Sequence, residues 1–162
     1  MRVVVDTNVS KVANGPNASP QATAQCVLAC IRYIDEICAG KHVLVLDDGW
    51  HILSEYMQQL RSTGQPGVGD GFLKWVLTNQ YNPVHCERVP ISSHPERGFR
   101  EFPEDPRLEN FDRSDRKFVA VSRAHASRPP IVNAVDTDWW SYRTVLESHG
   151  VSVLFLCPEL MR

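Results

Sequence analysis

The chain has 162 residues, of which 43% are hydrophobic and 22% are charged, and its formal net charge is −2. This composition excludes a disordered chain, and the length suits a single domain over residues 1–162 with a core of its own. The near-neutral charge excludes a protein that grips nucleic acid by bulk positive charge, so any nucleic-acid contact must be local.

The cysteines and the apolar runs bear on where the protein functions. The five cysteines are an odd number, and Cys26, Cys30 and Cys38 fall in a helix-like stretch without Cys-x-x-Cys spacing. We therefore expect reduced cysteines. The chain starts with a strand-like run rather than a signal-peptide pattern, and no apolar run approaches the roughly 20 residues that cross a bilayer. These features predict a cytoplasmic protein with no membrane contact.

In the first half of the chain, strand-like runs alternate with helix-like segments. Short apolar runs predict buried strands, and apolar residues at three- and four-residue steps predict helices. Glycine and proline mark the breaks. The expected elements are a strand at 2–5, a loop at 10–20, a helix at 20–38, a strand at 42–46, a helix from about 48 to 56, a break at 62–71 and a short helix at 72–78.

The second half continues the same alternation after a weaker strand candidate. Residues 92–110 contain prolines and many charges and predict an exposed loop, not a linker between domains. The other expected elements are a strand at 84–91, a helix at 114–124, a strand at 131–135, a helix at about 142–148 and a strand at 151–156.

This alternation predicts an α/β fold with a mostly parallel, Rossmann-like sheet that helices cover on both faces. In such sheets ligands bind beyond the carboxyl ends of the strands, where the strand order reverses. Acidic residues follow the expected strands at these ends. They are Asp6 after the first strand, Asp47 and Asp48 after the second, and Asp136 and Asp138 after the strand at 131–135.

Oxygen ligands of this kind favour hard cations such as Mg²⁺ and Mn²⁺. Asp47 and Asp48 are better explained as turn and helix-entry residues. Asp6 is the strongest candidate ligand, because it ends an apolar run and is followed by Thr7 and Asn8, which suit hydrogen bonding to a ligand. Glu55 lies in one expected helix, and Asp115 begins another.

Four motifs in order resemble the PIN-domain ribonuclease family over essentially the whole chain. They are Val5-Asp6-Thr7-Asn8, the acid in Leu53-Ser54-Glu55-Tyr56, Asp115-Arg116-Lys117-Phe118-Val119-Ala120, and Ile131-Val132-Asn133-Ala134-Val135-Asp136-Thr137-Asp138-Trp139. The resemblance implies a three-layer α/β/α sandwich and hydrolysis of RNA phosphodiester bonds with Mg²⁺ or Mn²⁺. Compared with compact toxin members of the family, this chain has extra residues at 62–71 and 92–110.

The resemblance also implies which residues act. Three catalytic and metal-binding positions fall on Asp6, Glu55 and Asp115, and the fourth falls on either Asp136 or Asp138. Thr7 and Asn8 would support these ligands. Asp112 is better explained as a helix-entry residue. The basic residues beside Asp115 would bind RNA phosphates, with a solvated helix face as the equal alternative. They are Arg113, Arg116 and Lys117.

The resemblance admits two biological roles, the toxin of a toxin-antitoxin pair, with an antitoxin protein as partner, and a housekeeping or defence nuclease. It also implies homodimers, which are common in the family. From a different class, the alternative is a non-catalytic PIN-like domain that binds protein or RNA. A phosphatase or a DNA nuclease would use the same carboxylates. Trp139 and Trp140 are expected to pack rather than to stack on a base.

Overall fold

The computed structural model describes residues 1–15, 18–62 and 67–161. Its main sheet has five parallel strands in the order β3-β2-β1-β6-β7. Their bounds are β1 Arg2–Val5, β2 Val43–Asp47, β3 Cys86–Val89, β6 Ile131–Asn133 and β7 Val153–Phe155. Each lies within or close to a run that the sequence predicts as a strand.

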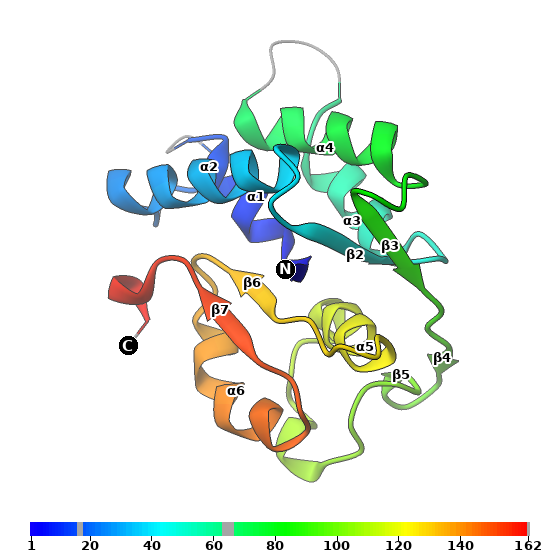
Figure 1. Cartoon of the computed structure of the whole chain (residues 1–162). Coiled ribbons are helices and arrows are strands. Elements are labelled where there is room, and N and C mark those ends of the chain that lie inside the picture. Colours follow the sequence, from blue (N-terminus) through cyan, green and yellow to red (C-terminus); the bar gives the residue numbers. More distant parts are fainter. Residues whose placement is uncertain (16–17, 63–66, 162) are drawn as a thin grey trace.

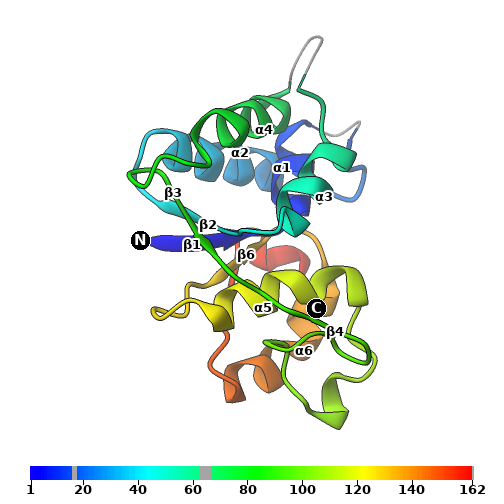
Figure 2. The same cartoon turned by 90° about the vertical axis from the view of Figure 1, so that its right-hand side faces the viewer.

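The helices form a layer on each face of this sheet (Figures 1 and 2). On one face lie α1 Thr7–Ala13, α2 Ala24–Cys38, α3 His51–Gln59 and α4 Val68–Asn79. On the other lie α5 Arg116–Ala124 and α6 Thr137–Ser148. The fold is therefore α/β, with the three-layer α/β/α arrangement that was expected.

Burial on both faces explains why the central strands have continuous apolar runs rather than alternating ones. Val3, Val4 and Val5 of β1 are completely buried, as are Ile131 and Val132 of β6. Side chains from both helical layers and from the strands belong to the same hydrophobic core.

The predicted loop at 10–20 is partly wrong, because α1 occupies Thr7–Ala13. Residues 16 and 17 lie outside the described part. Seven residues are too few for a helix that is stable on its own. This one forms because the Asp6 side chain caps its N-terminus and Val9 and Val12 are completely buried against the core.

Two other helices begin earlier than their apolar patterns predict. α4 begins at Val68 rather than at 72, because the Asp70 carboxylate accepts hydrogen bonds from the backbone N–H groups of Arg61 and Gly67. At the crossing of α4 with α1, a Cβ on Gly69 would overlap the carbonyl oxygen of Ser10. α6 begins at Thr137 rather than at about 142, capped by the Asp136 side chain.

The segment expected as the 92–110 loop contains a two-stranded antiparallel ribbon and a short 3-10 helix. The ribbon joins β4 Ser93–His94 to β5 Gly98–Phe99. Three 3-10 helices complete the elements, η1 Pro106–Leu108, η2 Arg113–Asp115 and η3 Pro158–Leu160. The segment therefore contains short regular elements of its own.

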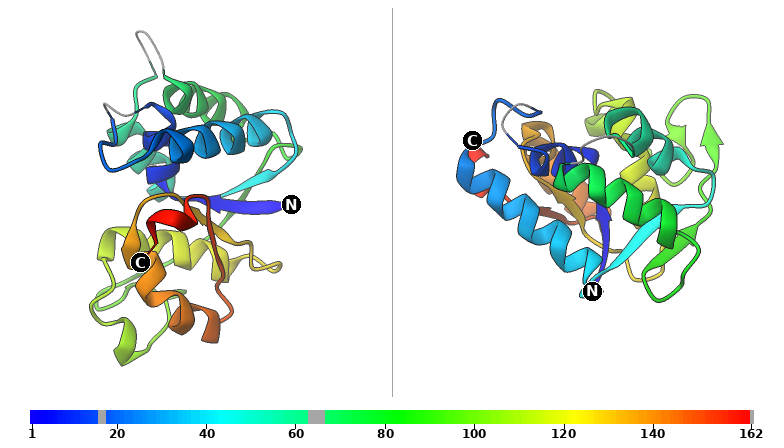
Figure 3. Two further views of the ribbon diagram at one scale, coloured as in Figure 1. Left: turned by 90° about the vertical axis from the view of Figure 1, so that its left-hand side faces the viewer. Right: turned by 90° about the horizontal axis from the view of Figure 1, so that it is seen from above.

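The strand order reverses beside β1. The chain proceeds from β1 through β2 to β3 on one side, and β6 and β7 extend the sheet on the other side (Figure 3). The carboxyl ends of β1 and β6 therefore border the crevice where open parallel sheets bind their ligands.

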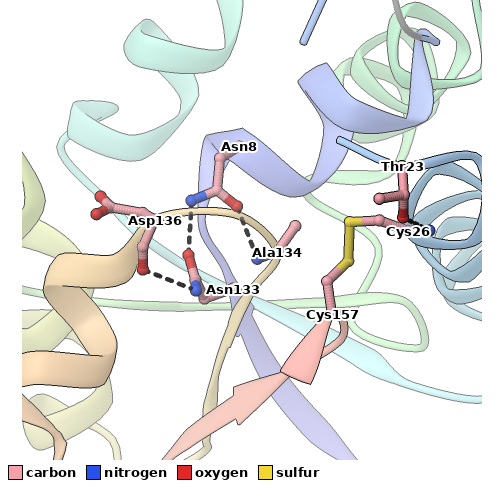
Figure 4. Close-up of a disulfide and its surroundings, with 7 residues drawn as sticks. All are labelled: Asn8, Thr23, Cys26, Asn133, Ala134, Asp136 and Cys157. Carbon is pink, nitrogen blue, oxygen red and sulfur yellow. Dashed lines mark hydrogen bonds between the residues drawn. A yellow bond between two sulfur atoms is a disulfide. The ribbon is translucent and has the colours of Figure 1, made fainter. Parts of the chain in front are cut away.

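The expectation that all cysteines are reduced is wrong. Cys26 of α2 forms a disulfide with Cys157, which follows β7 (Figure 4). Spacing along the sequence gave no sign of it, because the two residues are 131 positions apart. The prediction of a cytoplasmic protein loses the support that it drew from free thiols. Within the three described ranges, no helix is long and apolar enough to cross a membrane.

Candidate active site at the crossover of the sheet

Asp6 lies directly after β1, and the structure holds both of its carboxylate oxygens. Oδ1 accepts a hydrogen bond of 2.9 Å from the backbone N–H of Asn8, which caps α1. Oδ2 accepts one of 2.8 Å from the indole N–H of Trp139. Trp139 is completely buried and 133 residues away in the sequence. The carboxylate is therefore fixed between the two halves of the fold.

Burial makes the negative charge of Asp6 unfavourable. Burial, with smaller contributions from the carboxylates of Glu55 and Asp136, raises the pKa of Asp6 to about 7 against the opposing effect of the two hydrogen bonds. Near neutral pH this group is thus divided between its charged and neutral forms. A bound cation would favour the charged form.

Glu55 reaches the same place from α3. Its Oε2 accepts a hydrogen bond from the hydroxyl of Thr7, the residue after Asp6. Its Oε1 lies 2.7 Å from Nζ of Lys117 on α5, and both side chains of this ion pair are largely buried. Glu55 therefore connects helices on opposite faces of the sheet.

Asp115 ends η2 and precedes α5, so it approaches the site from the other helical layer. Burial raises its pKa to about 8, with further contributions from Asp6, Asp136, Asp112 and Glu55. Within the described ranges, no hydrogen-bond donor contacts its carboxylate. Of the acids at the site, Asp115 thus has the least compensated charge.

Asp136, not Asp138, lies with the other acids. The charge of Asp136 contributes to the raised pKa of both Asp6 and Asp115. The charge of Asp138 instead contributes to the raised pKa of Asp136. Burial, Asp138 and Asp112 together raise the pKa of Asp136. Its Oδ1 also accepts a 2.9 Å hydrogen bond from the backbone N–H of Asp138, which is exposed in the first turn of α6.

Asn8 ties the ends of β1 and β6 together. Its Nδ2 donates to Oδ1 of Asn133 at 2.7 Å, and its Oδ1 accepts from the backbone N–H of Ala134 at 2.8 Å. Asn133 in turn donates to the backbone carbonyl of Asp136 at 3.1 Å. Figure 4 shows this chain of contacts, with the Asp136 carboxylate directed away from it. The Thr7 hydroxyl thus contacts Glu55, and the Asn8 backbone N–H contacts Asp6, while the Asn8 side chain connects the two strand ends.

The four carboxylates offer the kind of ligand atoms that a hard cation prefers, but these atoms are not clustered closely. The four carboxylates supply only oxygen ligands. Burial, and to a lesser extent the neighbouring acids, raises the pKa of Asp6 and Asp115, and a bound divalent ion would oppose both effects. Within the described part of the chain, no three carboxylates bring ligand atoms within 4.8 Å of one another. Mg²⁺ tolerates such spacing because it keeps several of its waters.

A group of three cysteine sulfur atoms is closer together than the carboxylates are. The sulfur atoms of Cys26, Cys30 and Cys157 all lie within 4.8 Å of one another. Two of them form the disulfide, and burial raises the pKa of the third, Cys30, to about 12. This group lies between α2 and the C-terminal segment and contains none of the predicted acids.

The three basic residues predicted to bind RNA differ in their surroundings. Arg113 is exposed and Lys117 is paired with Glu55. Arg116 is only 4% exposed, and its guanidinium donates to the carbonyl oxygens of Arg97, Leu108, Glu109 and Phe111. The prediction of a phosphate contact by Arg116 is therefore corrected, because its donors are occupied inside the protein.

Two residues of the site did not emerge as such from the sequence. Trp139 was expected to pack, and the structure adds that its indole N–H binds Asp6. The sequence predicts Asn133 only as part of a strand. The structure adds that its side chain joins Asn8 to the turn before α6. The sequence carries one local sign of each role. Asn133 is a polar residue inside an apolar run, and Trp139 follows an acidic turn.

Comparisons with models of protein families, with curated proteins and with solved structures found no match for this chain. The resemblance to the PIN family therefore rests on the four motifs and their order.

Proposed function

We propose that this protein is a PIN-like endoribonuclease that hydrolyses RNA with the help of Mg²⁺ or Mn²⁺. The observation that carries the proposal is the convergence of Asp6, Glu55, Asp115 and Asp136 at the crossover of the sheet. They come from four separate places in the chain, and burial and mutual repulsion raise the pKa of Asp6 and Asp115. Clusters of perturbed titratable groups in a crevice are typical of active sites.

In this mechanism, the four acids would hold the cation, and Trp139, Thr7 and Asn8 would keep the acids in place. When bound, the cation supplies a water of lowered pKa and neutralises charge on the phosphate. Lys117 holds Glu55 and adds a positive charge next to the acids. No side chain of this site needs to act as the nucleophile.

The competing proposal is a non-catalytic PIN-like domain that binds RNA or protein. The ion pair between Glu55 and Lys117 favours it, because Lys117 already neutralises one of the four acids. The spacing of the carboxylates also favours it, because no three of them in the described part of the chain bring ligand atoms within 4.8 Å of one another. The two proposals differ in whether the purified protein cleaves RNA.

The deciding experiment incubates purified protein with labelled single-stranded RNA and Mn²⁺ or Mg²⁺. Cleavage should stop with a chelator, and Asp6→Asn and Asp115→Asn should each lower the rate by about a hundredfold or more, because loss of mere supporting residues already costs 10- to 100-fold in such sites. Wild-type rates in both variants, or no cleavage by wild type, would favour the non-catalytic domain. A single-stranded DNA substrate tests for a DNA nuclease.

Three further variants test the fourth acid, and two of them serve as matched controls. Asp136→Asn should lose activity while keeping its capping of α6, because asparagine caps helices as well as aspartate does. The matched controls are Asp138→Asn and Asp48→Asn, which remove exposed acids that follow β6 and β2 and should retain activity. A loss in Asp138→Asn alone would move the fourth ligand to that residue.

A further inference from the structure

A groove beside the carboxylates has a different lining from the acidic site. Its volume is about 390 Å³, and it shares Glu55 and Lys117 with the site. Three aromatic rings also line it, Trp50 and His51 at the start of α3 and Phe99 of β5. His51 and Phe99 pack edge to face, with ring centroids 5.1 Å apart. The groove thus combines flat apolar faces with charge.

Trp50 adopts a backbone conformation that its side chain disfavours. Its φ of 65° and ψ of 21° lie in the left-handed region, which bulky residues rarely adopt. The cause is local, because the Asp47 carboxylate accepts hydrogen bonds from the backbone N–H groups of Gly49, His51 and Ile52 and so closes the turn around Trp50. Trp50 itself contributes no side-chain cap to α3.

The backbone of this turn does not favour a tryptophan at position 50. Glycine adopts this backbone without strain. The Trp50 side chain is 36% exposed, so it is only partly used for packing. Strained residues of this kind cluster at ligand-binding sites, where the surrounding structure holds them in place.

The charge of the groove matches a nucleotide. Arg113 and Lys117 line it, and Arg113 also donates to the backbone carbonyl of Glu96 at 2.7 Å, which holds its guanidinium beside the ribbon. An aromatic face next to a cation is the combination that binds the base and phosphate of a single-stranded nucleotide.

We propose that this groove binds one unpaired nucleotide of the RNA next to the bond that is cut, with its base stacked on Trp50 and a phosphate at Arg113. The proposal rests on the proposed ribonuclease function and adds to it the place where a base and a phosphate beside the cut bond are bound. A base inside a duplex is already stacked on its neighbours and is not free to enter.

The test measures binding separately from cleavage. In the Asp115→Asn background, which should not cut, fluorescence anisotropy follows a labelled single-stranded oligoribonucleotide in the presence of Mg²⁺. Trp50→Ala should weaken binding roughly five- to hundredfold, the range expected for loss of one base-stacking contact. Trp50→Phe should retain most of the affinity, and the same strand annealed to its complement should bind more weakly than the single strand.

The matched control is Tyr81→Ala. Tyr81 is also an exposed aromatic residue beside a cation, with the Arg88 guanidinium 4.4 Å from its ring centroid. It precedes the amino end of β3, whereas Trp50 follows the carboxyl end of the neighbouring parallel strand β2. Loss of Tyr81 should leave binding unchanged.

Equal binding by Trp50→Ala and its parent, or an equal loss in Tyr81→Ala, would overturn the proposal. If wild type cuts RNA and Trp50→Ala binds normally, only the groove is refuted; if wild type cuts nothing while Trp50→Ala loses binding, only the cleavage is refuted.

Discussion

Asp115 combines a raised pKa with a carboxylate that no hydrogen-bond donor contacts in the described part of the chain. Its charge therefore opposes folding while serving the proposed cation site. Active sites often carry such a cost in stability. Asparagine has nearly the same shape as aspartate and lacks the charge. Asp115→Asn should therefore raise stability while it lowers activity.

We expect Asp115→Asn to stabilise the metal-free protein at and above pH 8 by up to roughly 5 kcal/mol, because each unit of pKa shift is worth about 1.4 kcal/mol. The folded pKa of about 8 lies above the ordinary value of 3.8, so the wild-type protein loses stability as pH rises from about 4 to about 8. In Asp115→Asn this loss should be smaller. Thermal unfolding in chelator over this pH range measures it, and equal pH profiles for the two proteins would contradict it.

Trp50 gives a second prediction, on backbone strain. Trp50→Ala and Trp50→Gly both lack the ring, but only glycine is unstrained at a φ of 65°. The Gly variant should therefore be more stable than the Ala variant by about 1 kcal/mol. Urea unfolding of the two variants gives the difference. A more stable Ala variant would show that the turn relaxes once the ring is removed.

At the level of elements, the segment between β3 and α5 is held by one buried side chain. The Arg116 guanidinium bonds to carbonyl oxygens at both ends of this segment and lies 4.5 Å from the centroid of the Phe102 ring. These contacts position η2, and with it Asp115 and Arg113. A residue predicted to bind RNA thus acts on the site through the backbone.

Arg116→Ala should lower the free energy of unfolding by about 2–4 kcal/mol, because it leaves several buried carbonyl groups without donors. Arg116→Lys should recover only part of this loss, since one ammonium group does not reproduce the planar fork of donors. Arg100→Ala is the matched control, an exposed arginine in the same segment. Urea denaturation measures all three, and equal stability of Arg116→Ala and wild type would refute the role assigned here.

Across the whole molecule, the disulfide between Cys26 and Cys157 links α2 to the segment after β7 and closes a loop with a sequence separation of 131. Cross-linking so long a loop restricts the unfolded chain. The C-terminal strand β7 is at the edge of the sheet, with one neighbour, β6. The disulfide therefore secures an element that has few other contacts.

Cys157→Ser should lower the free energy of unfolding by about 4–5 kcal/mol on the loop-entropy estimate. A reductant should destabilise wild type and Cys38→Ser, which removes a free and partly exposed thiol, but should not affect Cys157→Ser. Urea unfolding with and without reductant provides the measurement. Wild-type stability that does not respond to complete reduction would contradict the prediction.

The alternation of apolar runs and helical periodicity determined the class of fold and the edge of the sheet where Asp6 and Asp136 lie. These patterns are local, because each depends on residues within one or two turns or on successive positions of a strand. They identified neither α1, whose stability depends on packing, nor the start of α6, which depends on the Asp136 cap.

Only the tertiary structure decided which side chains meet. It placed the Trp139 indole on Asp6, buried Arg116 among carbonyl groups, brought Asp136 rather than Asp138 to the other acids and joined Cys26 to Cys157. Each of these depends on how distant segments pack, and the spacing of residues along the chain carries no direct information about that. The sequence by itself determined that acids gather at the crossover of a parallel sheet, and packing determined their partners and their charge.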